Sequence, residues 1–156
     1  MDIFETTGKT GPYTMSLIAI CSLAYKPHMM FYFLVGLFMN TILNLVLKGL
    51  IQQPRPEFNT RQLDIFLRNN GLRYVLGSDV FGMPSGHVQT SIYILAFIYL
   101  VTRNIVLSSI LLLLSVIVVV QRVVYNEHTI IQVVIGSIVG GLSGIIMYHI
   151  GKVSIM

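Results

Sequence analysis

The segment Phe81–His87 places a hydroxyl group and an imidazole beside two glycines and a proline, at the start of a long apolar run. An ionisable side chain at the entrance of a membrane span is costly and usually serves a function. Lys48, Arg122 and His128 stand at the borders of three other apolar runs. Together, these residue types can bind an anion that offers several oxygens.

Phosphate is the anion that suits these side chains best. A guanidinium fork pairs with two phosphate oxygens at once, and the hydroxyl of Ser85 adds a donor beside the free N–H groups of a helix start. The two imidazoles, His87 and His128, suggest a division of roles in which one attacks phosphorus and the other protonates the leaving oxygen. The residues therefore favour phosphoryl transfer.

A metal site is a weaker interpretation of the same residues. The acids nearest the motifs in sequence are Glu57, Asp79 and Glu127, and hard cations need more carboxylate ligands than these form in one cluster. Zinc takes three or four His, Cys or carboxylate ligands, and two histidines on separate helices are too few. We therefore expect no metal and no other cofactor.

The composition indicates where such a site would lie. Of the 156 residues, 54% are hydrophobic and only 10% are charged, against roughly 25% charged residues in soluble domains. The mean hydropathy is +0.78. These values predict a single integral membrane domain over residues 1–156. In a membrane protein, the net charge of +4 indicates contact with headgroups or anionic lipid rather than with nucleic acid.

Apolar segments predict an all-α, polytopic transmembrane bundle of about five spans with one long polar connection. The spans are residues 12–25, 29–47, 85–101, 105–120 and 129–150, and the connection is 49–84. In the second span, Asn40 and Asn44 share one helix face and are expected to bond to neighbouring helices. In the connection, Leu63, Phe66 and Leu67 predict a short amphipathic surface helix, with a substrate gate as an alternative.

The last span carries small residues at every fourth position, Gly136, Gly140 and Gly144. Such a row lets helix backbones approach closely. The same steps of four lead back to Gln132 and His128, so both side chains should lie on the packing side. We expect them to point into the bundle.

Counting the spans brings the polar residues together. Consecutive helices alternate in direction, so Lys48, His87, Arg122 and His128 all reach one membrane face, while Arg103 reaches the other. Combined with the chemistry of these side chains, this placement predicts metal-independent phosphoryl transfer on a membrane lipid.

Three motifs resemble the signatures of the phosphatidic acid phosphatase type 2 superfamily, whose helical core is shared with bacterial acid phosphatases and vanadium haloperoxidases. The motifs are Lys48-x6-Arg55-Pro56, Pro84-Ser85-Gly86-His87 and Arg122-x5-His128. The resemblance implies that His128 is a nucleophile that forms a phosphohistidine and that His87 is the general acid. It also implies a set of phosphate ligands, namely Lys48, Arg55, Ser85, Gly86 and Arg122.

Two positions depart from the general pattern of that superfamily. Gln121 stands where serine usually precedes the arginine, and Gln132 stands where aspartate usually follows the nucleophile by four residues. The carbonyl of Gln132 could still accept the imidazole N–H of His128 and fix its tautomer. We therefore include Gln132 among the candidate catalytic residues.

The dolichyldiphosphatase branch of the superfamily also has glutamine at this position. The segments that resemble this branch are Gln53–Pro56, Phe81–Ser85 and His128–Val133. The branch usually has serine at the position of Gly86, so this residue follows the general pattern instead. The implied reaction is hydrolysis of a polyprenyl (dolichyl-type) diphosphate to the monophosphate.

Other interpretations stay open. Lys48 and Arg122 would each also suit an interfacial anchor, and His128 with Gln132 could be an interhelical hydrogen-bond pair. A phosphatidate-type lipid phosphate phosphatase is the second substrate class. A lipid-phosphate-binding protein, catalytically weakened at Gln132, is the second function. A small transporter is a third, although no inverted repeat supports it.

The membrane orientation follows from the resemblance rather than from charge. Seven lysines and arginines fall on the motif face and three on the other, which by the positive-inside rule favours the cytoplasm. Without the proposed phosphate ligands Lys48, Arg55 and Arg122, this bias disappears. The resemblance implies a lumenal or extracytoplasmic site, in the endoplasmic reticulum membrane of a eukaryote. The expected partners are a lipid phosphate or diphosphate and the bilayer, and the oligomeric state does not follow from the sequence.

Overall fold

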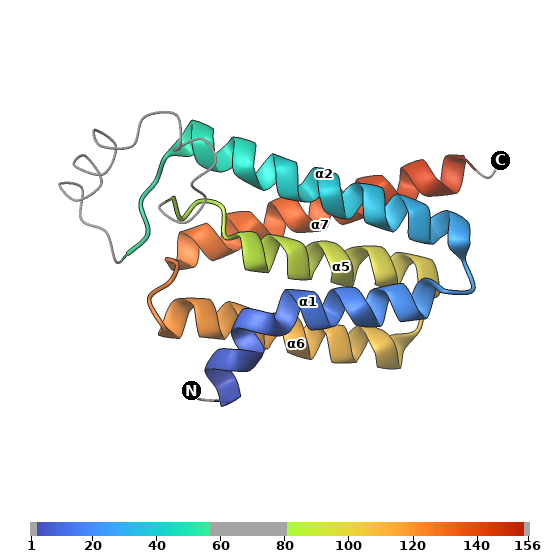
Figure 1. Cartoon of the computed structure of the whole chain (residues 1–156), viewed down its shortest axis with the longest axis horizontal. Coiled ribbons are helices and arrows are strands. Elements are labelled where there is room, and N and C mark those ends of the chain that lie inside the picture. Colours follow the sequence, from blue (N-terminus) through green and yellow to red (C-terminus); the bar gives the residue numbers. More distant parts are fainter. Residues whose placement is uncertain (1–2, 57–80, 155–156) are drawn as a thin grey trace.

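The computed structural model describes residues 3–56 and 81–154, and helices make up most of this part. They are α1 (Ile3–Leu23), α2 (Pro27–Ile51), α5 (Gly86–Thr102), α6 (Ile105–Val124) and α7 (Ile130–Val153). Successive helices run in alternating directions along one long axis (Figure 1). Between Pro54 and Phe81 there is a single isolated antiparallel bridge. The predicted all-α bundle is confirmed.

Three of the described helices are long and apolar enough to cross a membrane: α2, α6 and α7. Helix α5 is equally apolar but has only 17 residues. Helix α1 begins with a polar stretch that includes Glu5 and Lys9, so its length exceeds its apolar part. The chain is therefore an integral membrane protein, and α1 and α5 complete a bundle of five helices in the described residues.

The helices extend beyond the apolar segments that predicted them. Helix α1 begins at Ile3 rather than near residue 12, and it continues through Pro12. Its polar first turns are helical because backbone hydrogen bonds do not require apolar side chains, and Lys9 pairs with Glu5 one turn away at 2.7 Å. Helix α6 likewise continues to Val124, so Arg122 lies within its last turn.

The outer surface of the bundle is apolar. Large side chains such as Phe38, Leu113 and Leu142 are 65%, 62% and 56% exposed, and many similar ones follow α2, α6 and α7. Soluble monomers rarely expose apolar patches of this extent. The surface is that of a bundle surrounded by lipid.

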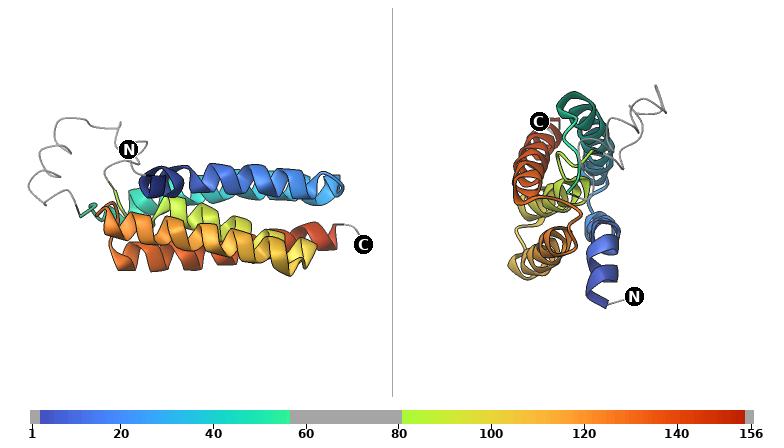
Figure 2. Two further views of the ribbon diagram at one scale, coloured as in Figure 1. Left: turned by 90° about the horizontal axis from the view of Figure 1, so that it is seen from below. Right: turned by 90° about the vertical axis from the view of Figure 1, so that its left-hand side faces the viewer.

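Helix α5 is the central element and contacts each of the other four described helices. Its inward residues Tyr93 and Phe97 pack against Phe33 of α2, with ring centroids 5.8 and 5.5 Å apart. The Tyr93 hydroxyl donates to the Phe33 carbonyl at 2.8 Å, which satisfies a polar group in the core. Figure 2 shows α5 enclosed by its neighbours when viewed along the bundle.

The glycine row of α7 faces α5, and the close backbone approach predicted from its spacing is confirmed. A side chain at Gly136 would place its Cβ 2.8 Å from the Ser85 carbonyl, and one at Gly144 would place it 2.7 Å from the Tyr93 carbonyl. Gly140 meets the backbone of Gln89 in the same way. Only glycine lets the two backbones come this close, so the row fixes α7 against the central helix.

The bundle has two ends, which we name by the residues they carry. The motif end holds the C-terminal ends of α2 and α6 and the N-terminal ends of α5 and α7, and it carries Lys48, Ser85, Arg122 and His128. The other end, with Lys26, Arg103 and Lys152, we call the opposite end. Figure 1 shows the start of α1 at the motif end as well. The amphipathic helix predicted at Leu63–Leu67 lies outside the described residues.

Candidate active site

A cavity of about 440 Å³ lies at the motif end, among α1, α2 and α5. Five residues predicted to form the site line it: Lys48, Arg55, Gly86, His87 and His128. The remaining lining comes mainly from α1 and α2, namely Pro12, Tyr13, Ser16, Leu37, Thr41, Asn44, Leu45 and Thr90. The structure therefore brings residues from all three motifs to one cavity.

The chain reverses sharply after α2, and this turn brings Arg55 back to the cavity. Gln52 adopts a left-handed conformation with φ 49° and donates its N–H to the Lys48 carbonyl at 2.9 Å. This bond ends the helix with a satisfied carbonyl. Beyond it, the Gln53 carbonyl accepts the N–H of Gly82 at 2.8 Å. The first motif is thus bonded to the segment that precedes α5.

A second turn connects α6 with α7 and brings His128 beside Arg122. Asn126 has φ 53°, a conformation that asparagine tolerates better than most residues. The His128 N–H closes the turn on the Arg122 carbonyl at 3.0 Å. Arg122 is 3% exposed and His128 is also 3% exposed. Both side chains are therefore buried in the protein at the motif end.

Glu127 is part of this cluster, and the sequence pattern did not assign it a role. Its Oε2 accepts a hydrogen bond from Arg55 Nη1 at 3.1 Å and forms an ion pair with Arg122 Nη1 at 3.2 Å. One carboxylate oxygen therefore holds the two arginines that the motifs nominate as phosphate ligands. The only signal in the sequence was its position directly before His128, since a single acid gives no periodic pattern.

Besides the amide of Gln121, which packs beside Gly8 of α1, three buried donor atoms at the motif end have no hydrogen-bond partner among the described residues: Ser85 Oγ, Arg55 Nε and Arg122 Nε. Ser85 is the N-cap of α5, yet its hydroxyl makes no capping bond, although serine in this position usually caps. Buried polar groups without partners are rare and require an explanation. These three atoms can donate to an anion.

The start of α7, by contrast, is fully capped. The Thr129 hydroxyl accepts the N–H of Gln132 at 3.3 Å, and the Gln132 side chain accepts the N–H of Thr129 at 3.2 Å. Gln132 Oε1 also lies 3.1 Å from His128 Nδ1, which is the predicted contact. With Nδ1 as the donor, the lone pair of the ring is on Nε2.

The amide nitrogen of Gln132 reaches in the other direction. It donates to Gln53 Oε1 at 3.2 Å and to the Pro54 carbonyl at 3.0 Å. The backbone carbonyl of Gln132 accepts the N–H of Ser85 at 3.1 Å. Gln132 is completely buried, and it contacts residues of all three motifs.

The environment keeps the His128 side chain neutral. Burial, followed by the positive charges of Arg55, Lys48 and Arg122, lowers the pKa of His128 from its ordinary value of 6.5 to about 3, while the hydrogen bond with Gln132 acts in the opposite direction. At neutral pH the ring therefore carries a free lone pair. This is the protonation state that a nucleophile requires.

An amide network lies directly beneath the cavity and supports the start of α5. Asn44 Nδ2 donates to Gln89 Oε1 at 2.8 Å and to the Pro84 carbonyl at 3.1 Å. Gln89 Nε2 donates to Asn40 Oδ1 at 3.0 Å. The predicted bonding of Asn40 and Asn44 to a neighbouring helix is confirmed. Gln89 was missed, although an amide in an apolar span was a sufficient signal.

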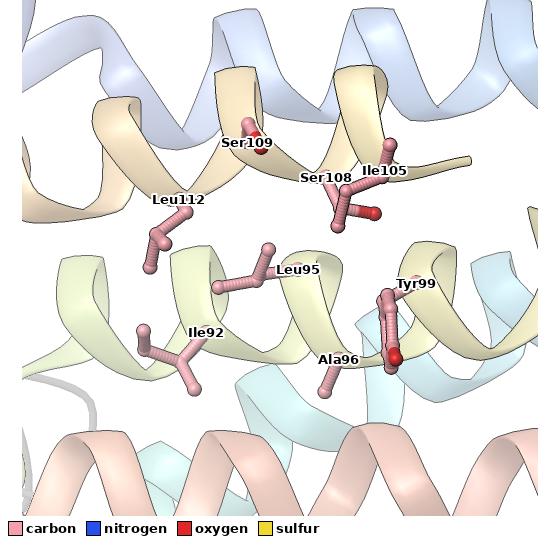
Figure 3. Close-up of a pocket in the computed structure, with 8 residues that line it drawn as sticks. All are labelled: Ile92, Leu95, Ala96, Tyr99, Ile105, Ser108, Ser109 and Leu112. Atoms are coloured by element: carbon pink, nitrogen blue, oxygen red, sulfur yellow. The ribbon is translucent and has the colours of Figure 1, made fainter. Parts of the chain in front are cut away.

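A second hollow, of about 330 Å³, lies between α5 and α6 and is nearly all apolar (Figure 3). Leu95 of α5 and Leu112 of α6 extend into it, and Tyr99 closes one side. Ser108 and Ser109 are its only hydroxyl-bearing residues besides this tyrosine. It has no ionisable cationic group, so it offers no site for a phosphate.

The apolar bundle and its cationic cavity define an integral membrane protein with a site suited to an anion. The model of the PAP2 superfamily matches residues 29–155, and the chain belongs to this superfamily. The family assignment made from the three motifs is therefore confirmed. Helix α1 precedes the matched residues, although it forms one wall of the cavity.

Among curated proteins, the chain is similar to the dolichyldiphosphatase of Saccharomyces cerevisiae (strain ATCC 204508 / S288c). The two are 32% identical over 125 residues, which cover 74% of this chain and 48% of the yeast protein. The chain thus spans about half the length of this relative. No solved structure matches the chain.

Proposed function

We propose that this protein is a membrane lipid phosphatase, a phosphoric ester hydrolase that acts on a polyprenyl diphosphate and releases the monophosphate. Membership of the PAP2 superfamily supports the class of reaction, and the similarity to a dolichyldiphosphatase supports the substrate. The reaction is metal-independent and passes through a phosphohistidine. The site belongs to a single domain that includes α1.

The unpartnered donors around His128 carry this proposal. Ser85 Oγ, Arg55 Nε and Arg122 Nε are buried without partners in the described part of the chain, and Lys48 and His87 line the adjoining cavity. A tetrahedral phosphate offers an acceptor oxygen to each of these positions. Carboxylate-rich metal sites have the opposite charge, so a cationic donor set suits direct binding of phosphate.

In the proposed reaction, Nε2 of His128 attacks the terminal phosphorus, a P–N bond forms, and the P–O bond to the lipid monophosphate breaks. His87 donates a proton to the departing oxygen. Water then attacks the phosphohistidine and gives its proton to His87, and inorganic phosphate leaves with Nε2 unprotonated again. Gln132 holds the ring through Nδ1 at 3.1 Å throughout.

The cavity also provides a place for the lipid chain. Helices α1 and α2 are joined at the opposite end and diverge toward the motif end (Figures 1 and 2). Between them, the cavity extends from Lys48 to Leu37, which lies three turns deeper in α2. A phosphate at the polar end would therefore leave the hydrocarbon chain directed between α1 and α2 into the bilayer.

Phosphate release by the purified full chain tests the proposal. In detergent, with a chelator present and a polyprenyl diphosphate as substrate, we expect steady release of inorganic phosphate. His128→Ala should reduce it by about 10³-fold or more, because the nucleophile is lost. His149→Ala, at the opposite end, is the matched control and should retain the wild-type rate. Loss of activity with chelator would contradict the metal-independent mechanism.

A rapid quench distinguishes catalysis from binding alone. With a substrate labelled in its terminal phosphate, the enzyme should retain an acid-labile, base-stable label that disappears in His128→Ala. Tight binding without label or phosphate release would identify a lipid-phosphate-binding protein. Faster turnover of phosphatidate than of polyprenyl diphosphate would assign the phosphatidate class instead.

We further propose that the motif end faces the lumenal or extracytoplasmic side, in the endoplasmic reticulum membrane of a eukaryote. Gln52 at the motif end and Ser154 at the opposite end are both exposed. In a Cys21→Ser background, Gln52→Cys should react with an impermeant thiol reagent from the lumenal side only, and Ser154→Cys from the cytoplasmic side only. The reverse pattern would place the site in the cytoplasm.

A further inference from the structure

We propose that Gln53 and Gln132 form a matched amide pair that holds the first motif against the third, which makes Gln53 a positioning residue for the reaction. This inference rests on the proposed function. It concerns one of the two positions where the chain departs from the general superfamily pattern, since Gln132 stands where an aspartate is usual.

Both ends of the Gln132 amide are used. Its oxygen accepts from His128 Nδ1 at 3.1 Å and from the Thr129 N–H at 3.2 Å. Its nitrogen donates to Gln53 Oε1 at 3.2 Å and to the Pro54 carbonyl at 3.0 Å. The side chain is completely buried, and an amide has two donor hydrogens and two acceptor lone pairs. Its hydrogen-bonding capacity is therefore filled.

A carboxylate could not make this set of contacts. It would accept from His128 and Thr129, but it has no hydrogen to give to Gln53 Oε1 or the Pro54 carbonyl. An ionised carboxylate facing a fixed carbonyl oxygen in a buried site is unfavourable. Because the Pro54 carbonyl is a fixed acceptor, a buried side chain that faces it from position 132 is more stable with a hydrogen to donate than as a carboxylate.

The surrounding backbone is arranged around this amide. A Cβ at Gly82 would lie 2.6 Å from Gln132 Nε2, so only glycine leaves room for the side chain. The Gly82 N–H bonds in turn to the Gln53 carbonyl at 2.8 Å. Since Pro54 directly precedes Arg55, the pair fixes the position of a phosphate ligand relative to the nucleophile.

A double-mutant cycle tests the pair. Gln53→Glu still offers an acceptor to Gln132, and we expect kcat/KM for polyprenyl diphosphate to fall about threefold. In Gln132→Glu, Gln53 can turn its amide to donate, and we expect a fall of about tenfold. The double variant places two carboxylates face to face, so we expect a fall of at least 300-fold, beyond the product of the single effects.

Gln52→Glu is the matched control, because it adds the same charge one residue away on an exposed side chain. Alone it should leave kcat/KM at the wild-type value, and combined with Gln132→Glu it should add no further loss. An excess loss in this control pair would show a general charge effect and would overturn the proposal. So would a Gln53→Glu/Gln132→Glu variant whose loss equals the product of the two single losses.

The pH profile separates positioning from a purely structural role. A carboxylate beside Nδ1 stabilises protonated His128, which otherwise faces Lys48, Arg55 and Arg122 with Glu127 beside it in sequence. Gln132→Glu should therefore move the acid limb of kcat/KM to higher pH, and Gln52→Glu should leave it in place. An unmoved acid limb in Gln132→Glu would contradict a role exerted through His128.

The same variants distinguish this inference from the proposed function. Hydrogen bonds between Gln53 and Gln132 stabilise the fold whether or not phosphate is released, so the thermal unfolding midpoints in detergent should show the same excess effect. If the wild-type protein released no phosphate, the proposed function would fail. A double variant whose unfolding midpoint falls by more than the sum of the two single effects would still establish the pair. Additive midpoints would overturn the pair itself.

Discussion

Histidines and cationic side chains gather at both ends of the bundle, and the two groups are bonded in different ways. At the opposite end, Lys26 Nζ donates to the Val101 carbonyl at 2.9 Å. His28 Nε2 lies 3.0 Å from the carbonyl of Gly151. These side chains bind backbone acceptors that helices leave free at their ends, so they serve to tie helices together.

At the motif end, the same residue types line one cavity, and the two arginines of this cluster keep unpartnered donor atoms. Arg55 and Arg122 share one oxygen of Glu127, and their Nε atoms have no partner in the described part of the chain. The opposite end shows instead a guanidinium over an aromatic face, with Arg103 5.4 Å from the Tyr99 ring centroid. What distinguishes a candidate site is therefore convergence of unsatisfied donors, since residue type is common to both ends.

The largest difference between the ends should appear on removal of a guanidinium. We expect Arg122→Gln to lower kcat/KM by roughly 10²–10³-fold, because the proposed reaction would lose a preorganised donor to the transferred phosphoryl group. Arg103→Gln, at the opposite end, should keep the wild-type value. Phosphate release by the two purified variants measures this, with thermal unfolding as the check on folding. Equal losses would remove the distinction between the ends.

A smaller difference between the ends is expected when a helix glycine is replaced by alanine and the free energy of unfolding is measured. A Cβ at Gly136 would lie 2.8 Å from the Ser85 carbonyl, whereas one at Gly151 would lie 3.1 Å from the movable ring of Tyr32. Backbone cannot yield easily, so Gly136→Ala should lower the free energy of unfolding by about 1–3 kcal/mol. Gly151→Ala should be nearly neutral, because a shifted ring is offset by about 0.5–1 kcal/mol of helix propensity. Unfolding in detergent measures both, and an equally damaging Gly151→Ala would contradict this account.

The smallest expected effect concerns the pH dependence of kcat/KM, which we expect titration of His128 to leave nearly unchanged between pH 7 and pH 5. A protonated histidine cannot attack phosphorus, so a nucleophile of ordinary pKa, about 6.5, would lose about 25-fold in kcat/KM between pH 7 and pH 5. Since burial and nearby cations lower the pKa of His128 to about 3, this group should cause less than a twofold loss over that range. Rates corrected for the separately titrated substrate measure this. A fall in kcat/KM centred near pH 6.5 would show that the pKa of His128 is not lowered.

Span counting was enough to predict which polar residues share a membrane face. Lys48, His87 and His128 meet in one cavity because helix direction alternates, and no side-chain detail is needed for that inference. The glycine row of α7 was equally predictable, because spacing by four residues has a direct meaning in helix packing. Periodic and directional features of the bundle are therefore readable from the sequence.

The remaining contacts depend on turns that have no periodic signature. Gln52 and Asn126 adopt left-handed conformations, and these two residues decide where Gln53 and Glu127 lie. The sequence left two interpretations of Gln132, a feature of the dolichyldiphosphatase branch or a weakened substitute for aspartate, because only its contact with His128 could be foreseen. Its donor side became visible with the fold, which brings Pro54 within 3.0 Å.

The shared carboxylate of Glu127 determines when the two arginine side chains lose their conformational freedom. An arginine side chain carries about 2 kcal/mol of rotamer entropy, and Glu127 Oε2 restrains two of them at 3.1 and 3.2 Å. Much of that freedom is lost when the chain folds, so the proposed lipid substrate would bind to arginine side chains whose positions are already fixed. In the proposed reaction, the negative charge of Glu127 would also lie near the bound phosphate and repel it, which would favour release of the product. Binding and release of the phosphate would thus both depend on Glu127.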